Sequence, residues 1–183
     1  MILTLTREIV TDYVVDNNYT VKGGSLYKVF INKIIQGQFL YSSELSFINY
    51  CDKKLIIDKK ADILNPDSTT LNGHYELTNW RMLVGYRDKM FFDGKEYSFK
   101  RLKQDMQYSL FKKESWGQRK FQLQHDNENV TYLFALNVPA LSLGSPFFKK
   151  PFSGSIELDN ATILVALAGL YLIERALDNE IYT

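Results

Sequence analysis

Three side chains in this 183-residue chain have the chemistry of a nucleophile or a general base: Cys51, His74 and His125. A histidine that is distant in sequence can activate a thiolate, so Cys51 with either histidine is one route to an enzyme. Asp126 and Glu128 beside His125 could ligate a metal, although a solvated hairpin turn explains the same residues. The chain has no phosphate-binding loop, GxSxG, HExxH or zinc-ligand spacing. We therefore predict a protein that is not an enzyme and that has no metal and no cofactor.

The charge of the chain is unevenly distributed, although its net value is only +1. Residues 81–120 contain eleven Lys or Arg against five Asp or Glu, a local charge of +6, whereas residues 121–183 carry −4. A net charge near zero argues against a dedicated nucleic-acid binder, while a local positive segment is typical of contact with an anionic partner. Solvated strand faces explain the same charges without any partner.

Several of these cations flank consecutive expected strands, so we expect them to gather on one rim of the fold. An anionic leaflet attracts each Lys or Arg near its surface by about 1 kcal/mol. The segment 147–152 places phenylalanines beside lysines, which suits a membrane interface or a loop whose phenylalanines cap the fold. The candidate lipid-binding residues are Lys100, Arg101, Lys103, Lys112, Lys113, Arg119, Lys120, Phe147 and Phe148.

The elements that must position these residues are mainly strands. The chain has twelve Phe and twelve Tyr, and aromatic residues favour half-buried pleated surfaces. Turn signals recur at short intervals and predict a meander that closes on itself or packs in two layers. Residues 43–50 are less clear, because they follow neither a strand period nor a helix period. The turn signals include Gly23-Gly24, Asn72-Gly73, Asp93-Gly94, Trp116-Gly117 and Asp126-Asn127.

One helix is expected near the end of the chain, over about residues 160–177. Residues 161–173 are apolar at every position except Thr162, and they contain no proline. Asp159 or Asn160 is the expected N-cap. A helix with no polar face before Glu174 must be surrounded by protein, and about 20 Å of apolar helix is too short to cross a bilayer.

Strands and helix together predict the architecture. An eight-stranded barrel is filled by its own side chains, whereas a wider barrel needs a filling that this helix can provide. A β-sandwich closed by the helix is the alternative, but it leaves one helix face wet. We therefore predict a single domain over residues 1–183, mainly β, in the form of a closed antiparallel β-barrel of about twelve strands around a central hydrophobic C-terminal helix.

This order of elements resembles the tubby C-terminal-like superfamily, in particular its LURP-one-related and phospholipid-scramblase-like branches. The resemblance rests on the successive hairpins, the strand Ser155–Leu158, and the helix with Glu174 and Arg175 at its far end. It implies a closed barrel of about twelve strands around a hydrophobic helix. Members include phosphoinositide-binding modules and lipid-handling membrane proteins. No motif aligns position by position, so no functional residue is carried over, and the chain lacks a cysteine cluster for acylation.

We therefore expect a non-enzymatic binding module that recognises anionic phospholipid headgroups or a protein partner, and no nucleic acid. Its N-terminal residues lack the features of a signal peptide, so a cytoplasmic protein, peripheral at a membrane, is expected. Two other classes stay open. One is a lipocalin-like carrier with an apolar ligand inside the barrel. A helix in the lumen would leave no room for such a ligand. The other is an enzyme that uses Cys51 or a histidine.

Overall fold

The computed structural model describes residues 1–16, 19–66, 70–78, 88–102, 105–109, 114–139 and 152–180. These residues form thirteen strands followed by a helix. The strands are β1 (Ile2–Asp16), β2 (Tyr19–Ile31), β3 (Ile34–Tyr41), β4 (Ser46–Tyr50), β5 (Lys53–Ile57), β6 (Asp62–Leu64), β7 (Leu71–Glu76), β8 (Lys89–Phe92), β9 (Lys95–Arg101), β10 (Asp105–Ser109), β11 (Glu114–His125), β12 (Glu128–Pro139) and β13 (Phe152–Asp159), and the helix is α2 (Ile163–Glu180).

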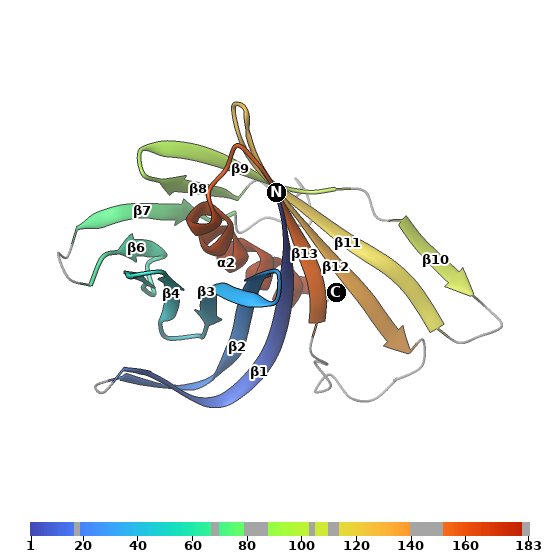
Figure 1. Ribbon diagram of the computed structural model, residues 1–183, viewed down its shortest axis with the longest axis horizontal. Coiled ribbons are helices and arrows are strands. Elements are labelled where there is room, and N and C mark those ends of the chain that lie inside the picture. Colours follow the sequence, from blue (N-terminus) through green and yellow to red (C-terminus); the bar gives the residue numbers. More distant parts are fainter. Residues whose placement is uncertain are drawn as a thin grey trace.

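Twelve of these strands close into an antiparallel barrel with α2 inside it (Figure 1). The ring runs from β11 through β12 and β13 to β1, and then in chain order from β1 to β9. It closes where residues 121–124 of β11 pair with residues 98–101 of β9. The first part of β11 instead pairs with β10, which lies outside the ring. The predicted closed barrel of about twelve strands around a hydrophobic C-terminal helix is confirmed.

Helix α2 forms the centre of the core. Every side chain from Ile163 to Glu174 is buried, and Leu167 and Leu170 are both 0% exposed. Two tyrosines from different parts of the barrel hold the helix: Tyr75 Oη donates to the carbonyl oxygen of Ala168, and Tyr132 Oη to that of Ala166, each at 2.8 Å. Burial raises the pKa of both hydroxyls well above the ordinary tyrosine value, so they remain donors at neutral pH.

The helix begins at Ile163, later than the predicted residue 160, and extends to Glu180. The prediction that Asp159 or Asn160 is the N-cap was wrong. Asp159 ends β13, and Asn160 has a φ of 54° and forms an isolated bridge with Asn129. Thr162 caps the helix instead, because its Oγ1 accepts from the backbone N–H of Val165 at 3.3 Å. The one polar residue of the apolar run is therefore the cap.

The turn signals were only partly reliable. Turns lie at Asp93-Gly94 and Asp126-Asn127 as predicted. The other three predictions were wrong, because these pairs lie within strands: Gly23-Gly24 in β2, Asn72-Gly73 in β7 and Trp116-Gly117 in β11. Gly73 shows the reason, since a Cβ there would lie 2.0 Å from the carbonyl oxygen of Phe91. The glycine permits close approach of two strands rather than a turn.

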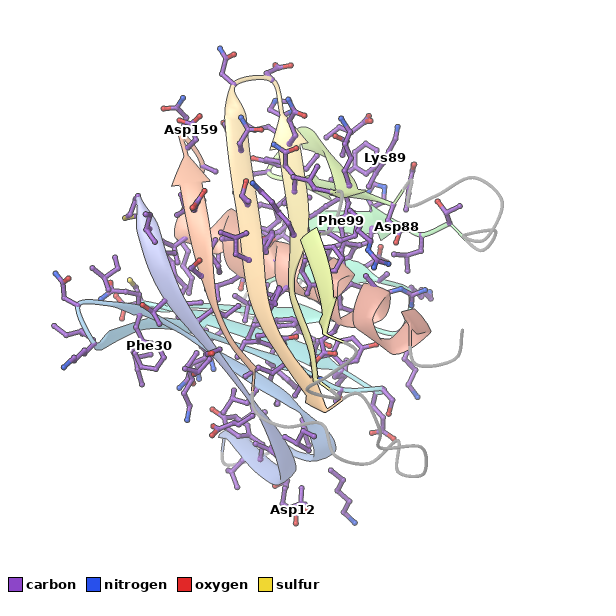
Figure 2. The ribbon with its side chains drawn as sticks, turned by 90° about the vertical axis from the view of Figure 1, so that its right-hand side faces the viewer. Asp12, Phe30, Asp88, Lys89, Phe99 and Asp159 are labelled. Carbon is purple, nitrogen blue, oxygen red and sulfur yellow. The ribbon has the colours of Figure 1, made fainter. Side chains whose placement is uncertain are left out.

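A second, smaller core lies outside the barrel. Strand β1 pairs with β13 only as far as Arg7, and β2 pairs with β3 only from Ser25 onward, so the remainder of β1 and β2 projects as a hairpin. Figure 2 shows this hairpin around Asp12. Its apolar side chains join those on the outer face of β3 and β4. The buried members of this cluster are Val21, Leu26, Leu40 and Phe47.

Gly169 of α2 lies against Tyr132 of β12. A Cβ at this position would lie 2.1 Å from Tyr132 Oη and 3.1 Å from Leu123 Cδ2. We expect Gly169→Ala to lower the free energy of unfolding by about 1–3 kcal/mol, although alanine is the better helix former. Urea denaturation measures the loss. The double variant Gly169→Ala/Tyr132→Phe removes the clashing hydroxyl and should recover part of it. A Gly169→Ala protein as stable as the wild type would contradict this packing.

Candidate functional site

One end of the barrel, which we call the Arg7 end, carries polar groups that packing alone does not explain. Because neighbouring strands are antiparallel, the last barrel residues of β1 and β3 and the first barrel residue of β2 meet there, namely Arg7, Tyr41 and Ser25. The C-terminal half of α2 reaches the same end, since Glu174 contacts Arg7. Helix and strands therefore converge on this end of the fold.

Arg7 and Glu174 form an ion pair inside the barrel at this end. Their side chains are 1% and 0% exposed, and both Nε and Nη2 of Arg7 lie 2.6 Å from Glu174 Oε1. Nη2 also donates to Ser25 Oγ at 2.7 Å, and the guanidinium lies 5.7 Å from the centroid of the Tyr27 ring. Two charges removed from water need such mutual pairing, because either of them alone would be costly to bury.

The pKa values of Arg7 and Tyr27 in this cluster are both shifted further from neutral pH. Burial lowers the pKa of the Arg7 guanidinium, but Tyr27 and Glu174 raise it by more, so it lies above the ordinary arginine value. Burial raises the pKa of the Tyr27 hydroxyl well above its usual range, Glu174 raises it further, and Arg7 opposes this. Arg7 therefore stays charged and Tyr27 neutral in the folded protein. Neither group is poised for proton transfer near neutral pH.

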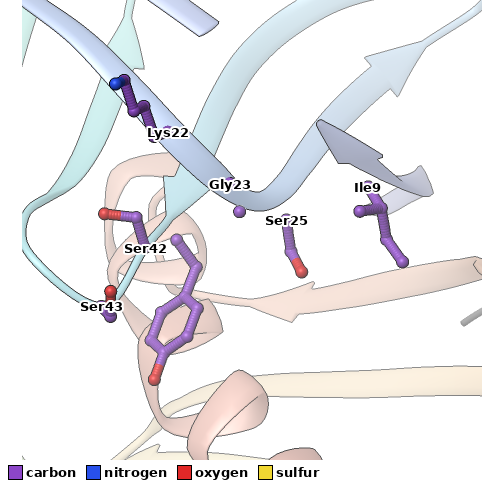
Figure 3. Close-up of a pocket in the computed structure, with 8 residues that line it drawn as sticks. Ile9, Lys22, Gly23, Ser25, Ser42 and Ser43 are labelled. Atoms are coloured by element: carbon purple, nitrogen blue, oxygen red, sulfur yellow. The ribbon is translucent and has the colours of Figure 1, made fainter. Parts of the chain in front are cut away.

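Two adjoining pockets form a groove at the Arg7 end, which we call the mouth groove. The first, of about 350 Å³, lies between the β1–β2 hairpin and the end of β3, and Figure 3 shows Lys22, Ser25 and Ser42 among its walls. The second, of about 300 Å³, includes Lys59 and Arg175. The pockets share a wall formed by residues 41–43, so they make one continuous surface.

The lining of the mouth groove suits an anionic ligand. It contains three cationic side chains, Lys22, Lys59 and Arg175, and two carboxylates, Glu44 and Asp58. Asp58 is engaged in its own turn, where its Oδ1 accepts from the backbone N–H groups of residues 60 and 62 at 2.8 and 3.0 Å. Serine hydroxyls complete the lining. Cations next to hydroxyl donors can bind phosphate or carboxylate oxygens through charge-assisted hydrogen bonds.

Gly23 lines the first pocket at the base of the hairpin. Its φ of 73° lies in the left-handed region that favours glycine, and a Cβ there would meet no atom within 4 Å. The pair Gly23-Gly24 was predicted only as a turn, and the groove was not predicted. The groove residues come from β1 to β5, the β3–β4 and β5–β6 connections and α2, so no short spacing in the sequence could have indicated the site.

The structure describes three of the predicted lipid-binding side chains. Lys100 of β9 and Lys120 of β11 lie on the outer face of adjoining strands, because their neighbours Phe99 and Phe121 are buried in the core. Arg101 is half-buried and lies directly opposite Phe121, on the inner face. Strand β9 runs in the same direction as β1, so it also ends at the Arg7 end, across the barrel from the mouth groove.

The structure gives no side-chain position for the other predicted lipid-binding residues. Arg119 belongs to β11, but its side chain is outside the described residues. The remaining predicted residues lie entirely outside the described ranges: Lys103, Lys112, Lys113, Phe147 and Phe148. Their part in the predicted basic rim therefore stays a prediction.

The nucleophile and base candidates lie away from the mouth groove. Cys51 is exposed in the β4–β5 turn, His74 stacks on Phe91 with ring centroids 4.6 Å apart, and His125 Nδ1 lies 2.7 Å from the carbonyl oxygen of residue 96. Glu128 beside His125 contacts Lys95 and accepts from a tyrosine hydroxyl at residue 97. Among the described contacts, no hydrogen bond or ion pair joins Cys51 to either histidine.

Comparisons of the chain with protein-family models, with curated proteins and with solved structures found no match. The resemblance to the tubby C-terminal-like superfamily thus remains a prediction. Within the described residues, no helix combines the length and the apolar character needed to cross a membrane.

Proposed function

We propose that this protein is a non-catalytic binding module that recognises anionic phospholipid headgroups through the Arg7 end of its barrel. The mouth groove carries the proposal, because Lys22, Lys59 and Arg175 line it together with serine hydroxyls. A phosphate group is both an anion and a multiple hydrogen-bond acceptor. Lysine and arginine provide charge and donors to such a group, and hydroxyls provide further donors.

Two further features support a membrane-bound ligand over a soluble one. Lys100 and Lys120 lie across the same end of the barrel, where they would add long-range attraction to an anionic leaflet. The resemblance to lipid-binding barrels points to the same ligand chemistry. We propose that the domain approaches a cytoplasmic leaflet end-on and is peripheral to the membrane.

The other function classes have less support. The carrier hypothesis needs an empty lumen, whereas α2 occupies it from Ile163 to Glu174. The enzyme hypothesis needs a nucleophile or base in a pocket, whereas neither Cys51 nor a histidine is among the residues that line the mouth groove. If the following experiment excludes a lipid, a protein partner at the same surface becomes the favoured alternative.

Sedimentation with liposomes tests the proposed function. We expect the protein to bind phosphatidylcholine vesicles that contain phosphatidylserine or phosphatidic acid, and not vesicles of phosphatidylcholine alone. Binding should weaken steeply as salt is raised, because exposed charges are screened over about 8 Å at physiological ionic strength. Equal binding to neutral and anionic vesicles, or binding to neither, would exclude the lipid and favour a protein partner.

A matched pair of charge reversals locates the contact. Lys22→Glu/Lys59→Glu changes the mouth groove, whereas Lys53→Glu/Lys54→Glu makes the same change in net charge at the opposite end, where β5 begins. All four side chains are exposed, so the fold should tolerate either pair. We expect the groove variant to lose at least about tenfold in vesicle binding and the control to lose little. Equal losses would show that net charge alone drives the contact.

A further inference from the structure

Ser25 lies at the boundary between the barrel interior and the mouth groove. It is 5% exposed, it shares the inward face of β2 with Tyr27, and it is paired with Ile9 of β1. It is also the first residue of β2 that pairs with β3, opposite Tyr41. The same side chain lines the first pocket of the groove. The small hydroxyl group of Ser25 therefore lies at the point where the barrel core meets the mouth groove.

The hydrogen bond from Arg7 determines whether the Ser25 hydroxyl acts as a donor or as an acceptor. Arg7 Nη2 lies 2.7 Å from Ser25 Oγ, and a guanidinium has only donors, so the serine oxygen is the acceptor in this bond. The hydroxyl retains its own hydrogen for donation. No described contact pairs this hydrogen with an acceptor, and the residue lines the first pocket of the groove. A hydroxyl that accepts from a cation is polarised and becomes a stronger donor.

Arg7 is linked to the mouth groove through its bond to Ser25. Its side chain is 1% exposed, and both Nε and Nη2 contact Glu174 Oε1, so the guanidinium is oriented by a carboxylate of the central helix. This planar fork is rigid, and lysine cannot reproduce it. Helix, strand and pocket are thereby linked in series by Glu174, Arg7 and Ser25.

We infer that Ser25 is a specificity-determining donor to the anionic oxygen bound in the mouth groove, and that Arg7 and Glu174 are positioning residues for its hydroxyl. The inference rests on the proposed function and deepens it, because it adds one oriented hydrogen bond to a recognition otherwise based on charge. The shared ligand chemistry is a phosphate oxygen. It can come from a lipid headgroup or from a soluble phosphate ester.

Ser25→Ala tests the donor. Binding is measured by titration calorimetry with inorganic phosphate and glycerol 3-phosphate, and by sedimentation with phosphatidic acid vesicles. We expect Ser25→Ala to weaken binding of the preferred probe at least about tenfold, which corresponds to about 1.4 kcal/mol. Ser25→Thr keeps the hydroxyl and should stay within about threefold of the wild type. Because Ser25→Ala changes no charge, the salt dependence of binding should keep the wild-type slope.

Ser153→Ala is the control for the loss of a serine hydroxyl. Ser153 of β13 is exposed and lines neither pocket of the groove, so we expect its loss to change binding less than about twofold. Thermal melting of each variant separates a binding defect from a folding defect. Preference for the vesicles or for the soluble phosphates assigns the source of the phosphate, and either source agrees with the inference.

A double-mutant cycle tests the positioning role of Arg7. Arg7→Lys keeps the charge but loses the fork, so its binding loss should resemble that of Ser25→Ala. The double variant should then bind no more weakly than Ser25→Ala alone, because both changes remove the same hydrogen bond. If Arg7→Lys does not fold, Glu174→Gln takes its place in the cycle. A merely structural role predicts losses that add.

The possible failures are distinguishable. A wild-type protein that does not sediment with the phosphatidic acid vesicles overturns the proposed function, whether or not it binds the soluble phosphates. Wild-type binding that is unchanged by Ser25→Ala overturns the donor role of Ser25 and leaves the proposed function intact. Additive losses in the cycle overturn the positioning role of Arg7 alone.

Discussion

A chain truncated after Leu158 is expected to lose its cooperative fold, because α2 supplies the centre of the core. The side chains from Ile163 to Glu174 are all buried, and the truncation would also remove the acceptors of Tyr75 and Tyr132. A barrel of twelve strands is too wide to be filled by its own side chains. Each buried leucine or isoleucine contributes about 1.5–3 kcal/mol, and a domain is typically stable by only about 5–15 kcal/mol.

Circular dichroism, size-exclusion chromatography and thermal melting measure the effect of the truncation, and single leucine variants grade it. Leu170 is 0% exposed, so Leu170→Ala should cost about 2–5 kcal/mol. Leu71 is 57% exposed, so Leu71→Ala should change stability by no more than about 0.5 kcal/mol. A truncated chain that stays soluble and melts cooperatively would show that the core does not depend on the helix.

The barrel with its central helix could be predicted because a single local pattern, the apolar run near the end of the chain, was sufficient to indicate it. A run of apolar residues without a polar face admits few environments, and a β-rich chain of this length can provide only one of them. The start of the helix was less predictable. Asn160 and Thr162 are both good N-caps, and only the bridge of Asn160 to Asn129 and its φ of 54° decide between them.

Residues 43–50 show why part of the sheet gave no pattern. Phe47 and Ile48 are neighbours in β4 and therefore face opposite sides, yet both are buried. Ile48 belongs to the main core around α2, whereas Phe47 belongs to the second core beneath the β1–β2 hairpin. A strand covered on both faces loses the alternation that identifies a half-buried strand. The cover comes from a hairpin that is distant in sequence.

The candidate site was the least predictable part for the same reason. Arg7 and Glu174 are 167 residues apart, so no local spacing in the sequence relates them. The sequence placed Glu174 at the polar end of an apolar helix, whereas at 0% exposed it is the most deeply buried charged residue among the described residues. The cations that line the mouth groove lie outside the basic segment 81–120. Charge counting therefore predicted an anionic partner but did not indicate this groove.

Removal of either partner of the buried ion pair is expected to cost about 3–5 kcal/mol. Arg7→Ala would leave the Glu174 carboxylate, and Glu174→Ala the Arg7 guanidinium, without a counter-charge in the core. The hydrophobic replacement Arg7→Met/Glu174→Leu removes both charges and should cost much less than either single variant. Urea denaturation of the three variants gives the comparison. A loss below about 1 kcal/mol in both single variants would contradict the burial of the pair.

The same double variant separates the two roles of the pair. Arg7→Met/Glu174→Leu should fold, but it removes the guanidinium that accounts for the orientation of the Ser25 hydroxyl. We therefore expect a stable protein whose binding to phosphatidic acid vesicles is as weak as that of Ser25→Ala. Full binding by this variant would mean that the pair serves stability alone. Weak binding with near-normal stability would mean that a costly buried ion pair is retained in the core because the groove above it needs an oriented donor.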